Sequence, residues 1–272
     1  MKRRLARAAW SGLKILGIAY LGVLLVLSFF ENRLVFRPAS AAESWIPPPT
    51  DEIRDVELTS AAGDRLVGWW LPCPGSERTI LYFHGNAGNL SHRGNSIVKM
   101  RKLLNAAVFI IDYPGYGKSS GSPTEAGAYQ AADAAYDWLV QSEKRDPKNL
   151  ILYGGSLGGG VAIELATRKT HQALVVVKSF TSVPDVGAGI FPWLPVRWIM
   201  RTRFDSIGRI STLRGPVFIA HGDRDTIIPY AHGEALYAAA NEPKRFHRLE
   251  GQNHNDALPE GFFAELKRFL GD

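Results

Sequence analysis

The 272-residue sequence contains a single cysteine, Cys73. An intramolecular disulfide is therefore impossible, and a metal cluster held by several thiolates is excluded. The seven histidines add no convincing metal site, because no pair combines the helical spacing of metal ligands with a third partner. We therefore expect neither a metal nor another cofactor.

The chain also has little net charge outside its N-terminus. Five of the positive charges behind the formal net charge of +6 precede the catalytic part of the chain, and the remainder carries 27 basic against 26 acidic residues. These five are Lys2, Arg3, Arg4, Arg7 and Lys14. No basic tract remains to follow a phosphate backbone, so nucleic acid is not an expected partner.

A hydrophobic content of 46% and a charged content of 21% are typical of a globular protein. The length suits one catalytic domain with a substantial core. We find no internal repeat and no low-complexity linker between domains.

One long apolar run lies near the N-terminus, where Trp10 to Phe30 contains Lys14 as its single charge. About 20 residues of this kind span a bilayer core, so the pattern predicts one transmembrane helix within residues 1–30. The basic cluster before the run outweighs Arg33 and Arg37, which Glu31 partly offsets. This asymmetry favours a cytoplasmic N-terminus and a catalytic domain on the other side of the membrane, in the periplasm, a lumen or the extracellular space.

A cleaved signal peptide is the alternative interpretation. Ala39-Ser40-Ala41 resembles a cleavage site, but it lies beyond the charged stretch ENRLVFRP, and the apolar run is long for a signal peptide. We therefore favour an uncleaved anchor, followed by a Pro-rich connector over residues 31–53 and a catalytic domain over residues 54–272.

Alternating and apolar runs predict eight strands. VELTSAAGDRLVGWWLP has the pattern of a β-hairpin that turns at Ala62-Gly63-Asp64. Six short, nearly continuous apolar runs follow: TILYFHG, AVFIIDYPG, NLILYGGS, ALVVVKSF, PVFIAHGD and KRFHRLEG. Helical patterns cover residues 91–104, 124–143, 157–168, 230–240 and 259–270. This order predicts an α/β fold with a mostly parallel eight-stranded sheet and helices on both faces.

The fifth of these strands runs directly into Gly154-Gly155-Ser156-Leu157-Gly158, and a helical pattern begins at once. Strand, serine and helix in this order form a nucleophile elbow in Gly-x-Ser-x-Gly sequences. A plain glycine-rich turn would have the same pattern. A nucleotide-binding loop is disfavoured because no Gly-Lys-Ser/Thr follows the glycines.

Other polar residues follow neighbouring strands at the same edge of the predicted sheet. Asp225 and His254 come after Ser156 in the order Ser, Asp, His, which is the order of an α/β-hydrolase triad. We expect Ser156 as nucleophile, His254 as base and Asp225 as the acid that orients the base. Asp223 is the rival acid, but its position nearer the strand favours bonding to turn backbone.

Two backbone N–H groups are expected to form an oxyanion hole. The Leu157 N–H follows the nucleophile directly. The sequence HGNAGN after the third strand offers the second donor, which we assign to Asn86, with Ala87 as the alternative. The same loop could be a simple strand-to-helix turn capped by Asn89 or Ser91.

Taken together, FHGNAGNLSHR, DYPGYGKSSGSPTEAG, YGGSLGGGVA, HGDRDTIIP and GQNHND resemble the membrane-anchored α/β-hydrolase domain family. That family includes bud-emergence-type proteins, lysophospholipid lipases and protein depalmitoylases. The resemblance covers residues 31–270 and implies the same three residues, Ser156, Asp225 and His254. It also implies a structural loop at DYPGYGKSSG, in which Tyr113 or Tyr116 borders the substrate pocket.

Residues 181–212 form an apolar insert that is too long for a simple crossover helix, and we expect a small lid over the elbow. Phe191, Trp193 and Trp198 are its expected substrate contacts, and interleaved arginines would suit an acyl chain beside an anionic head group. Alternatively, these side chains only cover the core. The sequence thus predicts a membrane-anchored serine hydrolase of carboxylic esters or thioesters, with an acyl lipid or acylated protein as substrate. A peptidase and a non-catalytic membrane scaffold remain the alternatives.

Overall fold

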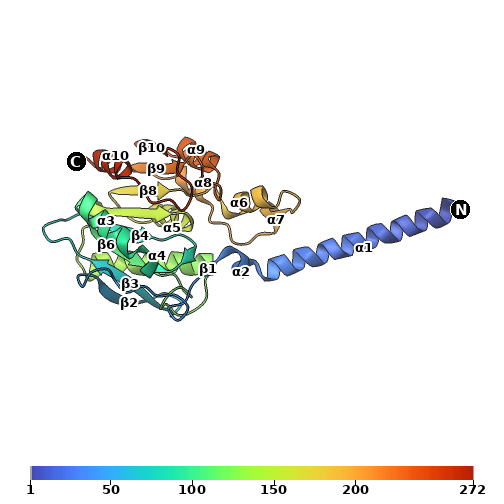
Figure 1. The fold of residues 1–272 in the computed structure, drawn as a ribbon, viewed down its shortest axis with the longest axis horizontal. Coiled ribbons are helices and arrows are strands. Elements are labelled where there is room, and N and C mark those ends of the chain that lie inside the picture. The colour runs from blue at the N-terminus through green and yellow to red at the C-terminus, as the bar shows by residue number, and fades with distance from the viewer. Residues whose placement is uncertain (1, 272) are drawn as a thin grey trace.

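The computed structural model describes residues 2–271, with the side chains of Lys2 and residues 4–9 excepted. Met1 and Asp272, the ends of the predicted anchor and catalytic domain, therefore lie outside the described residues, as do the side chains of Lys2, Arg4 and Arg7 of the basic cluster. Helix α1 (Lys2–Phe29) projects away from the rest of the chain (Figure 1). Its segment Trp10–Phe29 has a mean hydropathy of 2.1, is wholly unburied, and is long and apolar enough to cross a membrane.

The predicted mostly parallel eight-stranded sheet is confirmed, with the order β10-β9-β8-β7-β4-β6-β3-β2. Its strands are β2 (Arg54–Thr59), β3 (Arg65–Leu71), β4 (Thr79–Phe83), β6 (Ala107–Ile111), β7 (Leu150–Gly155), β8 (Ala173–Val177), β9 (Val217–Gly222) and β10 (Lys244–Leu249). The hairpin strand β3 is antiparallel to β2 and to β6, and the remaining pairs are parallel. The central strands are buried along their whole length, because helices cover both faces.

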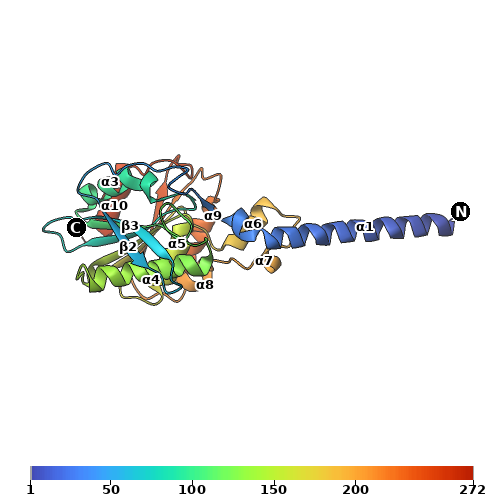
Figure 2. The same ribbon diagram turned by 90° about the horizontal axis from the view of Figure 1, so that it is seen from below.

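Two hydrophobic cores lie on the two faces of the sheet. Helices α3 (Gly94–Leu104) and α10 (Glu260–Phe269) cover one face, and α4 (Glu125–Gln141), α5 (Leu157–Ala166), α8 (Ser206–Ile210) and α9 (Tyr230–Ala239) lie on the other (Figure 2). Short 3₁₀ helices occur at Leu90–Arg93 and Pro147–Asn149. Parallel strands run their carboxyl ends to a common edge, which brings the loops after β4, β7, β9 and β10 together.

The segment between α1 and the sheet packs against the domain. After helix α2 (Glu31–Val35), Phe36 is fully buried, and β1 (Arg37–Pro38) pairs with β5 (Ala87–Gly88). The Ala39 and Ala41 N–H groups donate to the carbonyls of Gly88 and Gly117. The predicted connector is therefore held by the fold along this stretch, and the signal-peptidase-like motif at residues 39–41 is part of that contact.

The insert between β8 and β9 contains α6 (Val183–Ile190), α7 (Val196–Ile199) and α8. We call residues 181–204 the lid and residues 190–194 the lid tip. Two buried or half-buried glutamates hold the returning backbone: Glu31 accepts from the Thr202 N–H at 2.6 Å, and Glu125 accepts from the Phe204 N–H at 2.9 Å. Because Glu31 lies two residues after the end of α1, the C-terminal end of the lid is bound to the segment that joins α1 to the domain.

Candidate active site

Ser156 lies in a strained turn between β7 and α5. Its backbone has φ 53° and ψ −120°, a region that non-glycine residues rarely occupy and that costs about 1–3 kcal/mol. The glycines around it permit this turn. A Cβ on Gly154 would lie 2.1 Å from the Gly158 carbonyl oxygen, and a Cβ on Gly158 would lie 2.0 Å from the Phe83 carbonyl oxygen. The fold thus holds the serine side chain above the sheet edge.

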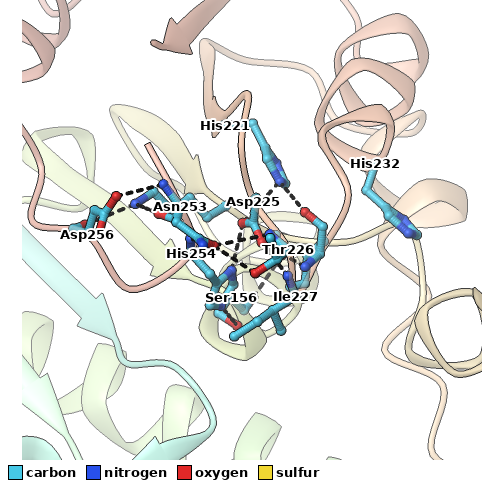
Figure 3. A network of polar contacts seen from close by, with 12 residues as sticks. Ser156, His221, Asp225, Thr226, Ile227, His232, Asn253, His254 and Asp256 are labelled. Atoms are coloured by element: carbon cyan, nitrogen blue, oxygen red, sulfur yellow. Dashed lines mark hydrogen bonds and ion pairs between the residues drawn. The ribbon is translucent and has the colours of Figure 1, made fainter. Parts of the chain in front are cut away.

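The structure brings Ser156, His254 and Asp225 into one hydrogen-bonded chain (Figure 3). His254 Nε2 lies 3.1 Å from Ser156 Oγ, and His254 Nδ1 lies 2.7 Å from Asp225 Oδ2. A carboxylate only accepts hydrogen bonds, so it places the imidazole proton on Nδ1. Nε2 is then free to accept the proton of the serine hydroxyl.

Asp225 is buried and richly hydrogen-bonded. Its Oδ1 accepts from the N–H groups of Ile227 at 2.9 Å and Ile228 at 2.8 Å, and His221 Nε2 lies 3.4 Å from Oδ2. Burial raises the pKa of Asp225, but the hydrogen bonds from His221, His254 and the Ile228 N–H outweigh it and hold the pKa well below its ordinary value. Asp225 is therefore ionised at neutral pH.

Asp223, the rival acid, points elsewhere. Its carboxylate accepts from the Arg248 guanidinium at 2.8 Å and from the Gly251 N–H at 2.7 Å. It therefore stabilises the turn that leads to His254 and does not touch the imidazole.

The two expected oxyanion donors belong to segments that lie next to Ser156. Leu157 opens α5, and the loop after β4 passes so close that a Cβ on Gly85 would lie 3.3 Å from the Ser156 Cβ. The Asn86 side chain is already occupied, since its Nδ2 donates to the Val35 carbonyl and its Oδ1 accepts from the Arg37 N–H. Of the Asn86 groups, the backbone N–H is therefore the one left to donate to a substrate oxyanion.

A cavity of about 1020 Å³ opens beside Ser156. Most of the residues that line it are apolar, and they include side chains of the lid, of the loop after β9 and of the last two turns of α1. Phe191 and Trp193 line it, as the sequence predicts.

Two of the predicted substrate contacts are wrong. Trp198 is 89% exposed, because α7 turns it away from the cavity. Tyr116 is fully buried behind the loop after β4, where its hydroxyl donates to Asn86 Oδ1 at 3.0 Å. Tyr116 therefore supports the loop and does not reach the substrate space.

Residues 80–258 match the model of the alpha/beta hydrolase family. The chain is 37% identical to the Mycobacterium tuberculosis protein Rv2307c over 94% of its own length and 92% of the relative's. It is 32% identical to protein bem46 of Schizosaccharomyces pombe, with coverages of 100% and 97%. The chain belongs to the α/β hydrolase family.

Among solved structures, this α/β hydrolase resembles the Pyrococcus furiosus esterase Pf2001, with a TM-score of 0.69 and 21% identity. The match covers 87% of the chain and 97% of the esterase. At this identity the likeness confirms the fold. The family match and this likeness together show that the protein is a hydrolase.

Lys178 is a further residue of this hydrolase near the site, and it was not predicted from the sequence. Its ammonium group is nearly buried at the end of β8 and donates to the carbonyls of Asn253 at 2.6 Å and Asp256 at 3.0 Å. Burial lowers the pKa of Lys178, while Asp256 and Asp225 oppose this effect. A lysine directly after the apolar run ALVVV was the available signal, since lysine is seldom buried without a role. Lys178 holds the loop that carries His254.

Lys178→Met is expected to lower kcat by up to about 10²-fold, because a freed loop misplaces the imidazole. Lys244→Met is the matched control, since Lys244 also donates to two backbone carbonyls, those of Tyr237 and Ala240, but away from His254. The test is a measurement of steady-state kcat for both variants, with the enzyme concentration corrected for the folded fraction. Equal kcat values in the two variants would contradict the assignment.

Proposed function

We propose that this protein is a membrane-anchored serine hydrolase that cleaves carboxylic esters or thioesters through an acyl-enzyme. The observation that carries the proposal is the hydrogen-bonded chain from Ser156 Oγ through His254 to the ionised Asp225. A serine hydroxyl is a poor nucleophile near neutral pH, and this arrangement supplies the base that it needs.

In the proposed mechanism, Ser156 Oγ attacks the acyl carbon while His254 Nε2 takes the hydroxyl proton. Asp225 stabilises the resulting imidazolium through Nδ1. The N–H groups of Leu157 and Asn86 stabilise the oxyanion, and His254 then protonates the leaving alcohol or thiol. A water molecule, deprotonated by His254, hydrolyses the acyl-enzyme and regenerates Ser156.

The cavity supports an acyl group as the part of the substrate that is recognised. Val183, Ile190, Phe191 and Leu194 of the lid lie along its wall, together with Ile227. Burial of a methylene group contributes about 0.8 kcal/mol. A cavity of this size and lining therefore suits the chain of an acyl lipid or acylated protein.

We further propose that α1 anchors the protein as a single membrane span, with the N-terminus in the cytoplasm and the catalytic domain outside it. The wholly unburied apolar segment Trp10–Phe29 supports a span. The burial of Phe36 and the bond of Glu31 to the lid backbone support retention of the helix, because cleavage at residues 39–41 would remove both contacts from the domain. A C-terminal reporter that is active in the cytoplasm alone would contradict the orientation.

A series of acyl esters and acyl thioesters from acetyl to palmitoyl tests the reaction and its acyl specificity. We expect kcat/KM to rise with chain length, by up to about fourfold per methylene until the cavity is filled. Equal rates for acetyl and long-chain substrates would contradict acyl recognition. Failure to cleave any ester or thioester, with cleavage of peptides instead, would replace the proposal with a peptidase.

A further inference from the structure

The lid tip lies against the apolar helix α1. The Tyr20 hydroxyl donates to the Trp193 carbonyl oxygen at 3.1 Å, and Figures 1 and 2 both place α6 and α7 beside the end of α1 nearest the domain. Tyr20 precedes Phe29, the last residue of α1, by nine residues, which is about 14 Å of helix. The hydrocarbon core of a bilayer is about 30 Å thick. When α1 spans the membrane with Phe29 at the surface, the contact between Tyr20 and Trp193 therefore lies one leaflet deep, within the hydrocarbon.

The lid tip has the side chains that such a location requires. Ile190 is 59% exposed and Trp193 is 63% exposed, values close to the 72% of Leu25 on α1 itself. Leu194 and Val196, in contrast, are buried under the lid. Large apolar side chains gathered on one protruding edge mark an interaction surface. The Tyr20 bond also satisfies a backbone carbonyl that hydrocarbon would leave unpaired.

The cavity beside Ser156 extends to the same place. Val23 and Leu27 of α1 line it together with Ile190 and Trp193 of the lid. Val23 and Leu27 are four residues apart and so share one face of α1, whereas Leu25 between them lies outside the lining. One wall of the cavity is therefore part of the apolar segment that suits a bilayer.

We propose that the lid tip inserts into the leaflet next to the catalytic domain and that the cavity opens sideways into that leaflet between the tip and α1. An acyl chain then passes from the lipid to Ser156 without crossing water. The lipid bilayer that holds α1 covers this surface, because the lid tip contacts that helix within the membrane-spanning segment. The inference rests on the proposed anchor and hydrolase, and it adds the entry route and a preference for substrates already in the membrane.

Spin labels on the full-length protein in vesicles of phosphatidylcholine and phosphatidylglycerol test the insertion. Cys73→Ser removes the native thiol, and Trp193→Cys, Leu25→Cys and Lys102→Cys place single labels on the lid tip, on α1 and on the exposed surface of α3. We expect the labels at 193 and 25 to favour contact with oxygen, and the label at 102 to favour a water-soluble nickel chelate.

A label at 193 that behaves like the one at 102, while the label at 25 stays in lipid, would overturn the insertion and leave the anchor intact. An aqueous label at 25 would overturn both. Hydrolysis of a soluble short ester by the samples labelled at 25 and 102, both outside the cavity wall, reports on the proposed chemistry independently, so the failure of one proposal does not mask the other.

A bulky substitution at the opening tests the route. Val23→Trp is expected to lower the ratio of turnover on a bilayer-resident long-chain acyl ester to turnover on a soluble short ester by roughly tenfold or more. Leu25→Trp is the matched control, because Leu25 lies on the same helix outside the cavity wall, and its ratio should equal that of the wild type. Equal ratios in the two variants would overturn the lateral entry.

Discussion

Asp225→Asn is expected to lower kcat by about 10⁴-fold while the protein stays folded. The asparagine Oδ1 can still accept from the N–H groups of Ile227 and Ile228, so its Nδ2 faces His254 Nδ1. An amide donor there favours the imidazole tautomer that carries its proton on Nε2. That nitrogen can no longer accept the Ser156 proton, and the nucleophile is not activated.

Asp223→Asn is the matched control for this variant. Asp223 lies two residues away, at the same sheet edge, and bonds Arg248 and Gly251 without touching His254. We expect its kcat to stay within about tenfold of the wild type, since its contacts serve the turn alone. Steady-state kinetics with an acyl ester on both variants decide the point, and a larger loss in Asp223→Asn would reverse the assignment of the acid.

Gly158→Ala is expected to give the largest loss of stability, at least about 1–3 kcal/mol, together with loss of activity. The added Cβ would lie 2.0 Å from the Phe83 carbonyl oxygen and 2.7 Å from that of His84. Both atoms belong to the backbone of the central strand and its following loop, so no side-chain rotation can relieve the overlap. Helix α5 must move away from β4, and Ser156 moves with it.

Gly155→Ala controls for the general effect of a methyl group in the same turn. A Cβ at Gly155 meets no atom within 4 Å, and its φ does not lie in the left-handed region. Denaturant unfolding of the two variants should show a clear loss of stability in Gly158→Ala and a small change in Gly155→Ala. Equal stabilities would show that the elbow tolerates displacement of α5 from β4.

The sheet and the elbow could both be predicted from short sequence patterns. Continuous apolar runs such as LILYG predict strands buried on both faces, and the glycines around Ser156 predict the strained turn. The position of Asp223 directly after the strand predicted its bond to the turn backbone, which left Asp225 as the expected partner of His254.

What the sequence could not predict depends on side-chain direction and long-range contact. Trp198 and Trp193 are both aromatic residues of the same insert, but the short helix α7 directs one to solvent while the other lines the cavity. The bond between Tyr20 and Trp193 joins residues 173 positions apart. The contacts of Lys178 with the His254 loop likewise cross 75 positions or more, so no local pattern specifies them.

Covalent labelling of the folded full-length protein with a fluorophosphonate, followed by mass spectrometry of its peptides, tests the central claim most directly. The account predicts one adduct, on Ser156, formed in the wild type, slowed in Asp225→Asn and absent from Ser156→Ala. Absence of an adduct on Ser156 in folded protein, or labelling that persists unchanged in Ser156→Ala, would contradict it.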